Sequence, residues 1–393
     1  MNRNDQALTS GFPPVFDHIG KHEVFPEVSH DENSRYNFLI SLDNYIMSVL
    51  QTGNRVAFEK RVKPVSQEQA GRGFRTRGEA SAAMKQDPHY QTWSALRRSV
   101  IEMRQQAGRS LVLRQIDELA RKAHRLNESR PETLILDPAV IKPDYTTMLD
   151  HECLPGGYYA EYREGDVANG AVYDVNQFVA TGGQAGLFSD GPGRAVAAWL
   201  KQHYPTFTPR HILDIGCGVG HNTLPLAVEY PDAQVTGIDV SAPMLRYGHA
   251  RAVSLGLEKV RFQQANAEAL PFDDNSFDWV QTSMFLHETS ASAIQQIIRE
   301  IYRVLAPGGV MLHVEQPQHG PDTPLFEKII EDWDAVYNNE PGLRVIHDMN
   351  VKELMTSVGF NTADLLQFGA KIRSNPVGAD LGYIWNVFGA WKK

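Results

Sequence analysis

The sequence predicts an α/β fold: a doubly wound, mostly parallel sheet preceded by a mainly α-helical accessory domain. From Arg210 onward, short apolar runs alternate with amphipathic helical segments, which is typical of a parallel sheet wrapped by helices on both faces. The first of these apolar runs stops at a glycine-rich turn. The earlier chain instead has helical periodicity around 34–53, 90–106 and 110–127.

The length of 393 residues favours two domains, since one domain usually takes about 150 residues. We expect a helical accessory domain at 1–150, which covers the substrate or forms a homodimer. A Gly- and Tyr-rich lid with a linking helix follows at 151–204, and the α/β domain occupies 205–393. Within the accessory part, the Gly- and Arg-rich stretch 64–88 predicts a mobile loop, and three prolines in 128–150 predict an extended connection.

The composition is that of a globular protein in a reducing compartment. Hydrophobic residues make up 42% and charged residues 22% of the chain. No stretch approaches the roughly 20 apolar residues that a membrane-spanning helix needs, and no apolar segment follows the start to form a signal peptide. Two cysteines, Cys153 and Cys217, cannot build a disulfide framework. We therefore expect a cytoplasmic protein without a membrane partner.

The net charge of −9 is unevenly distributed. Residues 55–125 contain 16 Lys and Arg against 7 Asp and Glu, so the rest of the chain is strongly acidic. A basic segment can bind nucleic acid, but it can equally dock on an acidic domain. We favour docking, because no nucleic-acid motif accompanies the charge.

The α/β half has five apolar runs that predict strands, with helices between them. A helix is expected from Ser241, a plausible N-cap, to Leu255, and another over 292–305, where isoleucines recur on one face. The predicted strands are 211–215, 234–239, 260–263, 277–284 and 310–315.

The glycine-rich turn after the first strand predicts a nucleoside site. Its spacing, Gly216-Cys217-Gly218-Val219-Gly220, is G-x-G-x-G rather than the G-x-G-x-x-G of pyrophosphate-binding turns. Asp214 would repel a pyrophosphate but suits a cationic ligand. Asp239 ends the second strand 21 residues after Gly218, where a carboxylate commonly binds ribose hydroxyls. A nucleoside with a positively charged, amino-acid-like tail satisfies all three features.

Four stretches carry a family resemblance: "HILDIGCGVG" at 211–220, "VTGIDVSAPML" at 235–245, "ANAEALPFDDNSFDWV" at 265–280 and "EIYRVLAPGGVML" at 300–312. In these stretches the chain resembles the class I S-adenosylmethionine-dependent methyltransferases, in the subgroup of the quinone-biosynthesis C-methyltransferases. The resemblance implies a Rossmann-like methyltransferase fold, S-adenosylmethionine as cofactor and an enzymatic methyl transfer. It covers a little over a quarter of the chain.

The resemblance also implies roles for individual residues. Asp214, Gly216 and Gly218 would surround the methionine moiety, with Ser283 lining the same side. Asp239 would bind the ribose hydroxyls. The remaining cofactor positions concern the adenine: Met244 would pack on it, and Asn266-Ala267 would place an amide oxygen at its amino group, where the family often has Asp.

Candidate catalytic residues follow the fourth and fifth strands. His287 and Glu288 lie directly after the fourth strand, so His287 is the first candidate base and Glu288 its orienter or a substrate contact. Glu315 ends the fifth strand and is a candidate pocket residue, whereas His313 on the same face is expected in the core. A cap of the next helix explains His287 equally well, so both roles stay open.

The substrate is expected to be a small organic molecule methylated on oxygen or carbon. Enzymes that methylate amide or base nitrogens usually have Asn or Asp and two prolines after the fourth strand, but this chain has Thr282-Ser283-Met284-Phe285. Tyr173 in the lid and Tyr337 in a polar-aromatic stretch after the fifth strand are candidate substrate contacts. No spacing of ligand residues predicts a metal site.

Three alternatives remain open at this level. The basic segment 55–125 could guide an RNA methyltransferase to phosphates. The fold could serve a non-catalytic partner protein, although the cofactor turn is intact. The sulfonium could also promote a reaction other than methylation.

Overall fold

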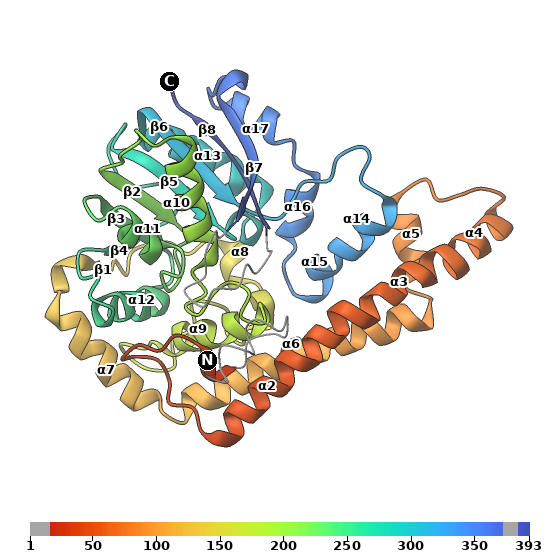
Figure 1. Ribbon diagram of the computed structural model, residues 1–393, viewed down its shortest axis with the longest axis horizontal. Helices are drawn as coiled ribbons and strands as arrows, with labels where there is room; N and C mark the ends of the chain where they lie inside the picture. Colours follow the sequence, from red (N-terminus) through yellow and green to blue (C-terminus); the bar gives the residue numbers. More distant parts are fainter. Residues whose placement is uncertain (1–15, 372–383) are drawn as a thin grey trace, which may run out of the picture.

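The computed structural model describes residues 16–371 and 384–393. Its centre is an eight-stranded sheet with the order β1-β4-β3-β2-β5-β6-β8-β7 (Figure 1). All pairs are parallel except those of β8, which runs antiparallel to β6 and to β7. The predicted doubly wound, mostly parallel sheet is confirmed.

The strands match the apolar runs of the sequence closely. Many of their buried residues are Val, Ile, Leu and Phe, which suit a sheet covered on both faces. The bounds are β1 Leu134–Ile135, β2 His211–Ile215, β3 Gln234–Asp239, β4 Arg261–Gln264, β5 Phe277–Ser283, β6 Leu305–Val314, β7 Leu365–Lys371 and β8 Ile384–Trp391.

Helices cover the sheet as the periodicity predicts. In α12 (Ala242–Ser254), the side chain of Ser241 accepts a hydrogen bond from the backbone N–H of Met244, so Ser241 is the N-cap. In α13 (Ala291–Val304), the isoleucines are buried against the sheet. The other helices beside the sheet are α10 Gly191–His203, α11 Thr223–Glu229 and α17 Val351–Ser357.

The N-terminal region is helical and more continuous than the sequence suggests. A capping box between Ser29 and Glu32 starts α2, and the helix continues through two π-helical turns to residue 70. The prediction of a loop at 64–88 is wrong: Thr76 caps a further helix there through the N–H of Glu79. The elements are α2 His30–Tyr45, η2 Ile46–Leu50, α3 Gln51–Ala57, η3 Phe58–Val62, α4 Lys63–Ala70, α5 Arg77–Met84, α6 Pro88–Leu113 and α7 Ile116–Ser129.

Two segments that are predicted to be a connection and a lid also contain strands or helices that pack with the rest of the chain. Leu134 and Ile135 pair with β4, so the stretch 128–150 supplies an edge strand and the short helix α8 (Asp144–Thr147). The expected lid contains α9 (Ala168–Ala180), which is mostly buried between α6 and α12 and is therefore a core layer. The α/β domain thus uses parts of the first 200 residues. The proposed division at 150 and 205 stays a prediction.

An insertion between β6 and β7, residues 316–348, lies beside the N-terminal helices (Figure 1). It contains α14 (Leu325–Glu331), α15 (Trp333–Tyr337) and α16 (Gly342–Asp348). Trp333 packs edge-on to Trp93 of α6, with ring centroids 5.6 Å apart. The N-terminal and C-terminal parts of the chain therefore share a hydrophobic cluster.

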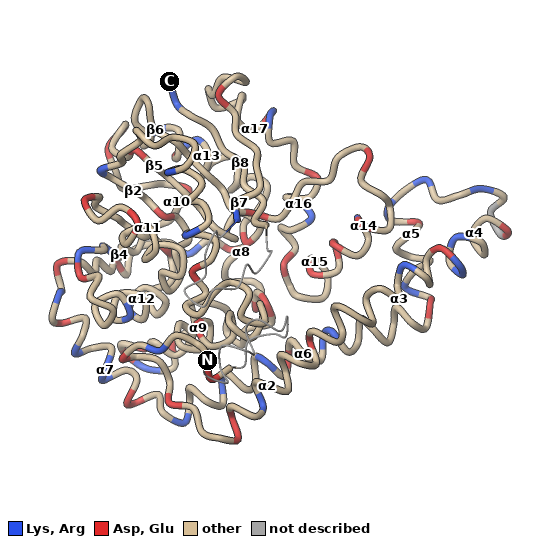
Figure 2. The backbone as a smooth tube through the Cα atoms, viewed as in Figure 1, with Lys and Arg blue, Asp and Glu red and all other residues tan. Residues whose placement is uncertain are grey.

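Acidic side chains of this insertion pair with the basic segment. Arg97 contacts Asp334 at 2.8 Å, Arg77 contacts Asp332 at 3.0 Å, and Arg55 pairs with Glu327. Figure 2 shows Lys and Arg interspersed with Asp and Glu along these helices. The charge of 55–125 is thus used in part for docking, as the sequence analysis favours. None of the described helices has the length and apolar character needed to cross a membrane.

Helices α9 and α12 pack closely at Gly170, which predicts a stability effect. A Cβ atom on Gly170 would lie 2.6 Å from the Cβ of Tyr247, a fully buried residue. We expect Gly170→Ala to lower the free energy of unfolding by about 1–3 kcal/mol through overpacking, measured by chemical denaturation. The control is Gly78→Ala in α5, where the added Cβ would lie 3.8 Å from its nearest neighbour, the hydroxyl oxygen of Thr76. That change should be neutral or slightly stabilising; equal effects of both would contradict the packing argument.

Candidate functional site

The order of strands reverses between β2 and β5, and the glycine-rich turn lies at this point. Gly216 and Gly218 have φ angles of 70° and 51°, in the left-handed region that favours glycine. At Gly216 a Cβ would also lie 2.2 Å from the ring of Phe285. The turn brings the ends of β2 and β5 to the crevice where α/β sheets bind ligands.

A cleft opens beside this turn. The residues that line it include four of the predicted cofactor positions: Gly216, Asp239, Asn266 and Ala267. The sequence analysis missed the others, which come from the ends of β3 and β5 and from the α8 region: Val240, Phe285, Pro143, Tyr145 and Thr146 among them. Val240 directly follows the strand-terminal Asp239, which is a signal that sequence reasoning could have used.

Two buried carboxylates, Asp214 and Asp239, determine which charge a ligand should have beside the glycine-rich turn. Asp239 accepts hydrogen bonds from the N–H groups of Gly218 at 3.0 Å and Ser241 at 2.9 Å. Burial raises the pKa of Asp239, and it raises the pKa of Asp214 to about 7. A carboxylate in so poorly solvated a place favours a cationic neighbour. The pair therefore fits a ligand with a sulfonium and an ammonium group.

The other predicted cofactor residues differ in their placement. Ser283 ends β5, and its buried hydroxyl has no hydrogen-bond partner among the described residues, so it is available to a ligand. The side-chain oxygen of Asn266 accepts from the N–H of Glu268 at 2.9 Å and retains a lone pair. Met244 is buried in an apolar cluster with Val219 and Tyr247 instead of lining the cleft, because it lies on the inner side of α12.

Beyond the turn, a buried polar cluster lies at the carboxyl ends of β5 and β6. His287 Nδ1 lies 2.5 Å from Glu315 Oε1, and its Nε2 lies 3.6 Å from Glu340 Oε1 and 3.8 Å from Glu288 Oε1. We call His287, Glu288, Glu315 and Glu340 the polar cluster. The structure thus brings the predicted His287, Glu288 and Glu315 together.

The environment of the polar cluster raises the pKa values of both His287 and Glu288. Burial alone would lower the pKa of His287, but the carboxylates of Glu315, Glu288 and Glu340 raise it to about 10. Burial raises the pKa of Glu288 to about 7, against the opposing effect of the His287 charge. The carboxylates thus keep a proton on His287 at neutral pH, and burial brings the pKa of Glu288 close to neutrality.

Aromatic residues of the 151–204 segment connect the polar cluster to the turn. The hydroxyl of Tyr158 donates to Glu288 Oε1 at 3.2 Å, and its ring packs edge-on to Tyr173 at 5.7 Å. Tyr173 in turn lies 4.0 Å from the position of a Cβ on Gly218. The predicted Tyr173 therefore lies between the cofactor turn and the polar cluster.

Tyr337 is placed differently from the prediction. Its ring contacts Trp333, with centroids 5.3 Å apart, and Lys85 lies over its face at 5.7 Å. It belongs to the hydrophobic cluster shared with the N-terminal helices. His313, expected in the core, is fully buried, and burial lowers its pKa to about 4.

Sequence reasoning missed Glu340, Tyr158 and His151 as members or neighbours of the polar cluster. His151 Nε2 lies 3.6 Å from Glu288 Oε2. These residues come from segments far apart in the sequence. No local pattern could have predicted their meeting.

Among the residues that the structure describes, two groups of His and Glu side chains lie close enough to hold a metal ion: His287, Glu288 and Glu340, and His319, Glu331 and His347. The first group is better explained as an ion-pair network. A metal ligand must be an unprotonated imidazole, whereas the surrounding carboxylates keep a proton on His287. The second group is treated further below.

Comparison with known proteins agrees with this geometry. Residues 212–309 match the family described as a methyltransferase domain. The chain is 43% identical over 109 residues to a demethylmenaquinone methyltransferase of Thermus thermophilus. The matched residues make up 28% of this chain and 48% of that protein. It is 32% identical over 164 residues to the ubiquinone/menaquinone biosynthesis C-methyltransferase UbiE of Brucella canis, 41% of this chain and 57% of that protein.

Among solved structures, the YcgJ protein of Bacillus subtilis is 20% identical, with a TM-score of 0.37, over 51% of this chain and 98% of its own. The chain spans about half the length of the curated relatives it matches. Residues 212–309 form a methyltransferase domain of the class I, S-adenosylmethionine-dependent type. Within that class, the domain resembles the quinone-biosynthesis methyltransferases.

Proposed function

We propose that this chain transfers the methyl group of S-adenosylmethionine to an oxygen or carbon atom of a small organic metabolite. Asp214, Gly216, Gly218, Asp239 and Ser283 would hold the cofactor, which supplies the electrophilic methyl group. The polar cluster would hold and deprotonate the acceptor. Tyr173 and Tyr158 would close the space between them.

The observation that carries this proposal is a buried oxygen of Glu288 that accepts no hydrogen bond from the described residues. Glu288 Oε2 is buried and has no hydrogen-bond partner among the described residues, while Oε1 accepts from Tyr158. A hydroxyl or an acidic carbon must lose a proton when it attacks a sulfonium, and a base with a pKa near 7 suits that task. Glu288 is thus the proton acceptor, and His287 is the cation that orients it and offsets the carboxylate charge.

The relatives support a metabolite substrate without fixing the methylated atom. One of them is described as a C-methyltransferase of ubiquinone and menaquinone biosynthesis. The similarity covers the cofactor-binding part, whereas Tyr158, Glu340 and most of the accessory helices lie outside residues 212–309. Carbon and oxygen acceptors therefore both stay in the proposal.

The alternatives receive less support. An RNA methyltransferase would use the basic 55–125 segment for phosphates, but several of its arginines already pair with carboxylates. A non-catalytic partner protein would not need the intact cofactor turn or the polar cluster. A homodimer through the N-terminal helices stays a prediction.

The pKa values predict how the methyl-transfer rate depends on pH. Glu288 must be ionised to accept a proton, so the rate should fall as the pH drops below about 7. His287 must be protonated, so the rate should fall again as the pH rises through about 10. Tyr158, His151, Glu315 and Glu340 also face Glu288, so the measured values belong to the whole cluster.

The measurement is a pH–rate profile with an acceptor found by methyl-label transfer. Glu288→Gln should remove the acidic limb of the profile. An acidic limb that persists in this variant would show that another group accepts the proton.

A further inference from the structure

We propose that His319, Glu331 and His347 form a binding site for Zn²⁺ that joins three segments of the insertion 316–348 to one another. Each of the three side chains can present one ligand atom, and these atoms all lie within 4.8 Å of one another. Two imidazoles and one carboxylate, with a fourth position left for water, are a common ligand set for zinc. This inference does not depend on the proposed methyl transfer.

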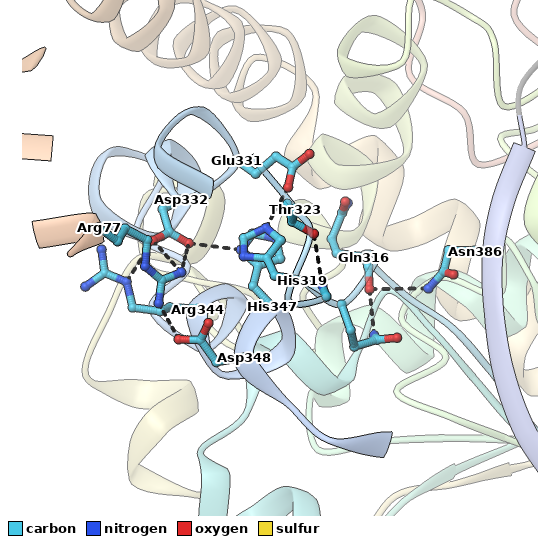
Figure 3. Close-up of polar contacts among 12 residues, drawn as sticks. Arg77, Gln316, His319, Thr323, Glu331, Asp332, Arg344, His347, Asp348 and Asn386 are labelled. Atoms are coloured by element: carbon cyan, nitrogen blue, oxygen red, sulfur yellow. Dashed lines mark hydrogen bonds and ion pairs between the residues drawn. The ribbon is translucent and has the colours of Figure 1, made fainter. Parts of the chain in front are cut away.

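Three separate segments bring the ligands together (Figure 3). His319 lies in the loop after β6, Glu331 is the last residue of α14, and His347 lies near the end of α16. The backbone N–H of His319 donates to the carbonyl oxygen of His347 at 2.7 Å. The two imidazole rings are stacked, with centroids 4.4 Å apart and an interplanar angle of 23°. The backbone contact therefore holds both histidines in place before any metal binds.

The surroundings of the histidines favour metal binding over a simple hydrogen-bonded pair. Both side chains are 3% exposed, and the buried Nδ1 of His319 has no hydrogen-bond partner among the described residues. Glu331 Oε2 lies 2.6 Å from His319 Nε2, and the Glu331 side chain is 41% exposed. The group thus combines a buried, incompletely paired imidazole with a carboxylate that opens to solvent, as a site for a hydrated cation requires.

The carboxylate of Asp332 orients the imidazole ring of His347. Asp332 Oδ1 lies 3.0 Å from His347 Nδ1, which leaves Nε2 of His347 free as a ligand atom. A carboxylate that holds the other ring nitrogen of a metal-binding histidine is a frequent feature of zinc sites. Asp332 is itself paired with Arg77 at 3.0 Å and Arg344 at 3.2 Å, so its charge is held in position (Figure 3).

The position of the group suggests what the metal would do. Asp332 connects the group through Arg77 to α5 of the N-terminal region, and the same insertion carries Glu340 into the polar cluster. A metal that binds the folded chain stabilises it by mass action. Zn²⁺ would therefore raise the thermal stability of the chain and fix the insertion that completes the polar cluster.

The test measures Zn²⁺ binding to the full chain without an affinity tag. Metal content after equilibrium dialysis should be one Zn²⁺ per chain, and the melting temperature should rise with Zn²⁺ concentration. Glu331→Gln, at a largely solvent-accessible position that should tolerate the change, should weaken Zn²⁺ binding at least about tenfold. The double variant His319→Ala/His347→Ala should abolish binding. Co²⁺ bound to the wild type should give the visible absorption bands of a low-symmetry nitrogen and oxygen site.

Two controls keep the assignment specific. His124→Ala changes an exposed histidine of α7 and should leave the affinity for Zn²⁺ unchanged. Glu340→Gln changes the polar cluster and should also leave it unchanged. The proposal is overturned if the wild type binds no Zn²⁺, if His124→Ala weakens binding as much as Glu331→Gln, or if binding is lost in Glu340→Gln.

Discussion

Replacing Asp239 with alanine should abolish S-adenosylmethionine binding. The carboxylate of Asp239 accepts hydrogen bonds from the N–H groups of Gly218 and Ser241, so it holds the glycine-rich turn as well as the expected ribose position. Removing it would leave two backbone donors of the cofactor site without their acceptor. Isothermal titration calorimetry should show no measurable heat of binding at concentrations where the wild type saturates.

The matched control for this experiment is Asp232→Ala. Asp232 is an exposed carboxylate in the turn before β3, so its loss removes the same charge from the same part of the domain. The affinity for the cofactor should stay within about threefold of the wild type in this variant. Equal losses in both variants would point to a general electrostatic effect and would remove Asp239 from its specific role.

The second large effect is expected at Glu288. Glu288→Gln keeps the size of the side chain but removes its basicity, and general-base catalysis typically contributes about 10²–10⁴-fold. We expect turnover to fall at least about a hundredfold, while the affinity for S-adenosylmethionine stays within about threefold. Steady-state kinetics and calorimetry on the same preparation separate the two effects.

His287→Ala provides the comparison within the polar cluster. Turnover should fall at least about tenfold, because Glu288 and Glu315 would lose the cation between them. The pKa of Glu288 should rise, which moves the acidic limb of the pH–rate profile to higher pH. Unchanged turnover in His287→Ala would remove the histidine from the reaction, and unchanged turnover in Glu288→Gln would contradict its role as proton acceptor.

The sequence predicts the fold of the α/β half well because local runs of apolar residues determine where its strands lie. The apolar run of β2 stops at a glycine and that of β3 ends in Asp239, and the strands follow these runs closely. The two residues of β1 carry no such signal, because their pairing with β4 depends on the neighbouring strand. The Gly and Arg content of residues 64–88 predicts a loop, although Thr76 and Glu79 together are a helix-start signal.

More of the cofactor site than of the catalytic site could be predicted from the sequence. Gly216, Asp239, Asn266 and Ala267 lie on consecutive strand ends and line one cleft. Glu340 comes from the insertion and reaches His287 only through the tertiary fold. The proposed exchange of roles between His287 and Glu288 also depends on three-dimensional structure, because it rests on the burial of three carboxylates around one imidazole.

The central claim is that the chain methylates a small organic molecule, and label transfer tests it most directly. The full chain is incubated with S-adenosylmethionine carrying a labelled methyl group and a metabolite extract, and the products are separated by mass spectrometry. We expect a small-molecule product that gains one labelled methyl group, formed by the wild type and absent with Asp239→Ala. Label found only in RNA, or in no product although the cofactor binds, would contradict it.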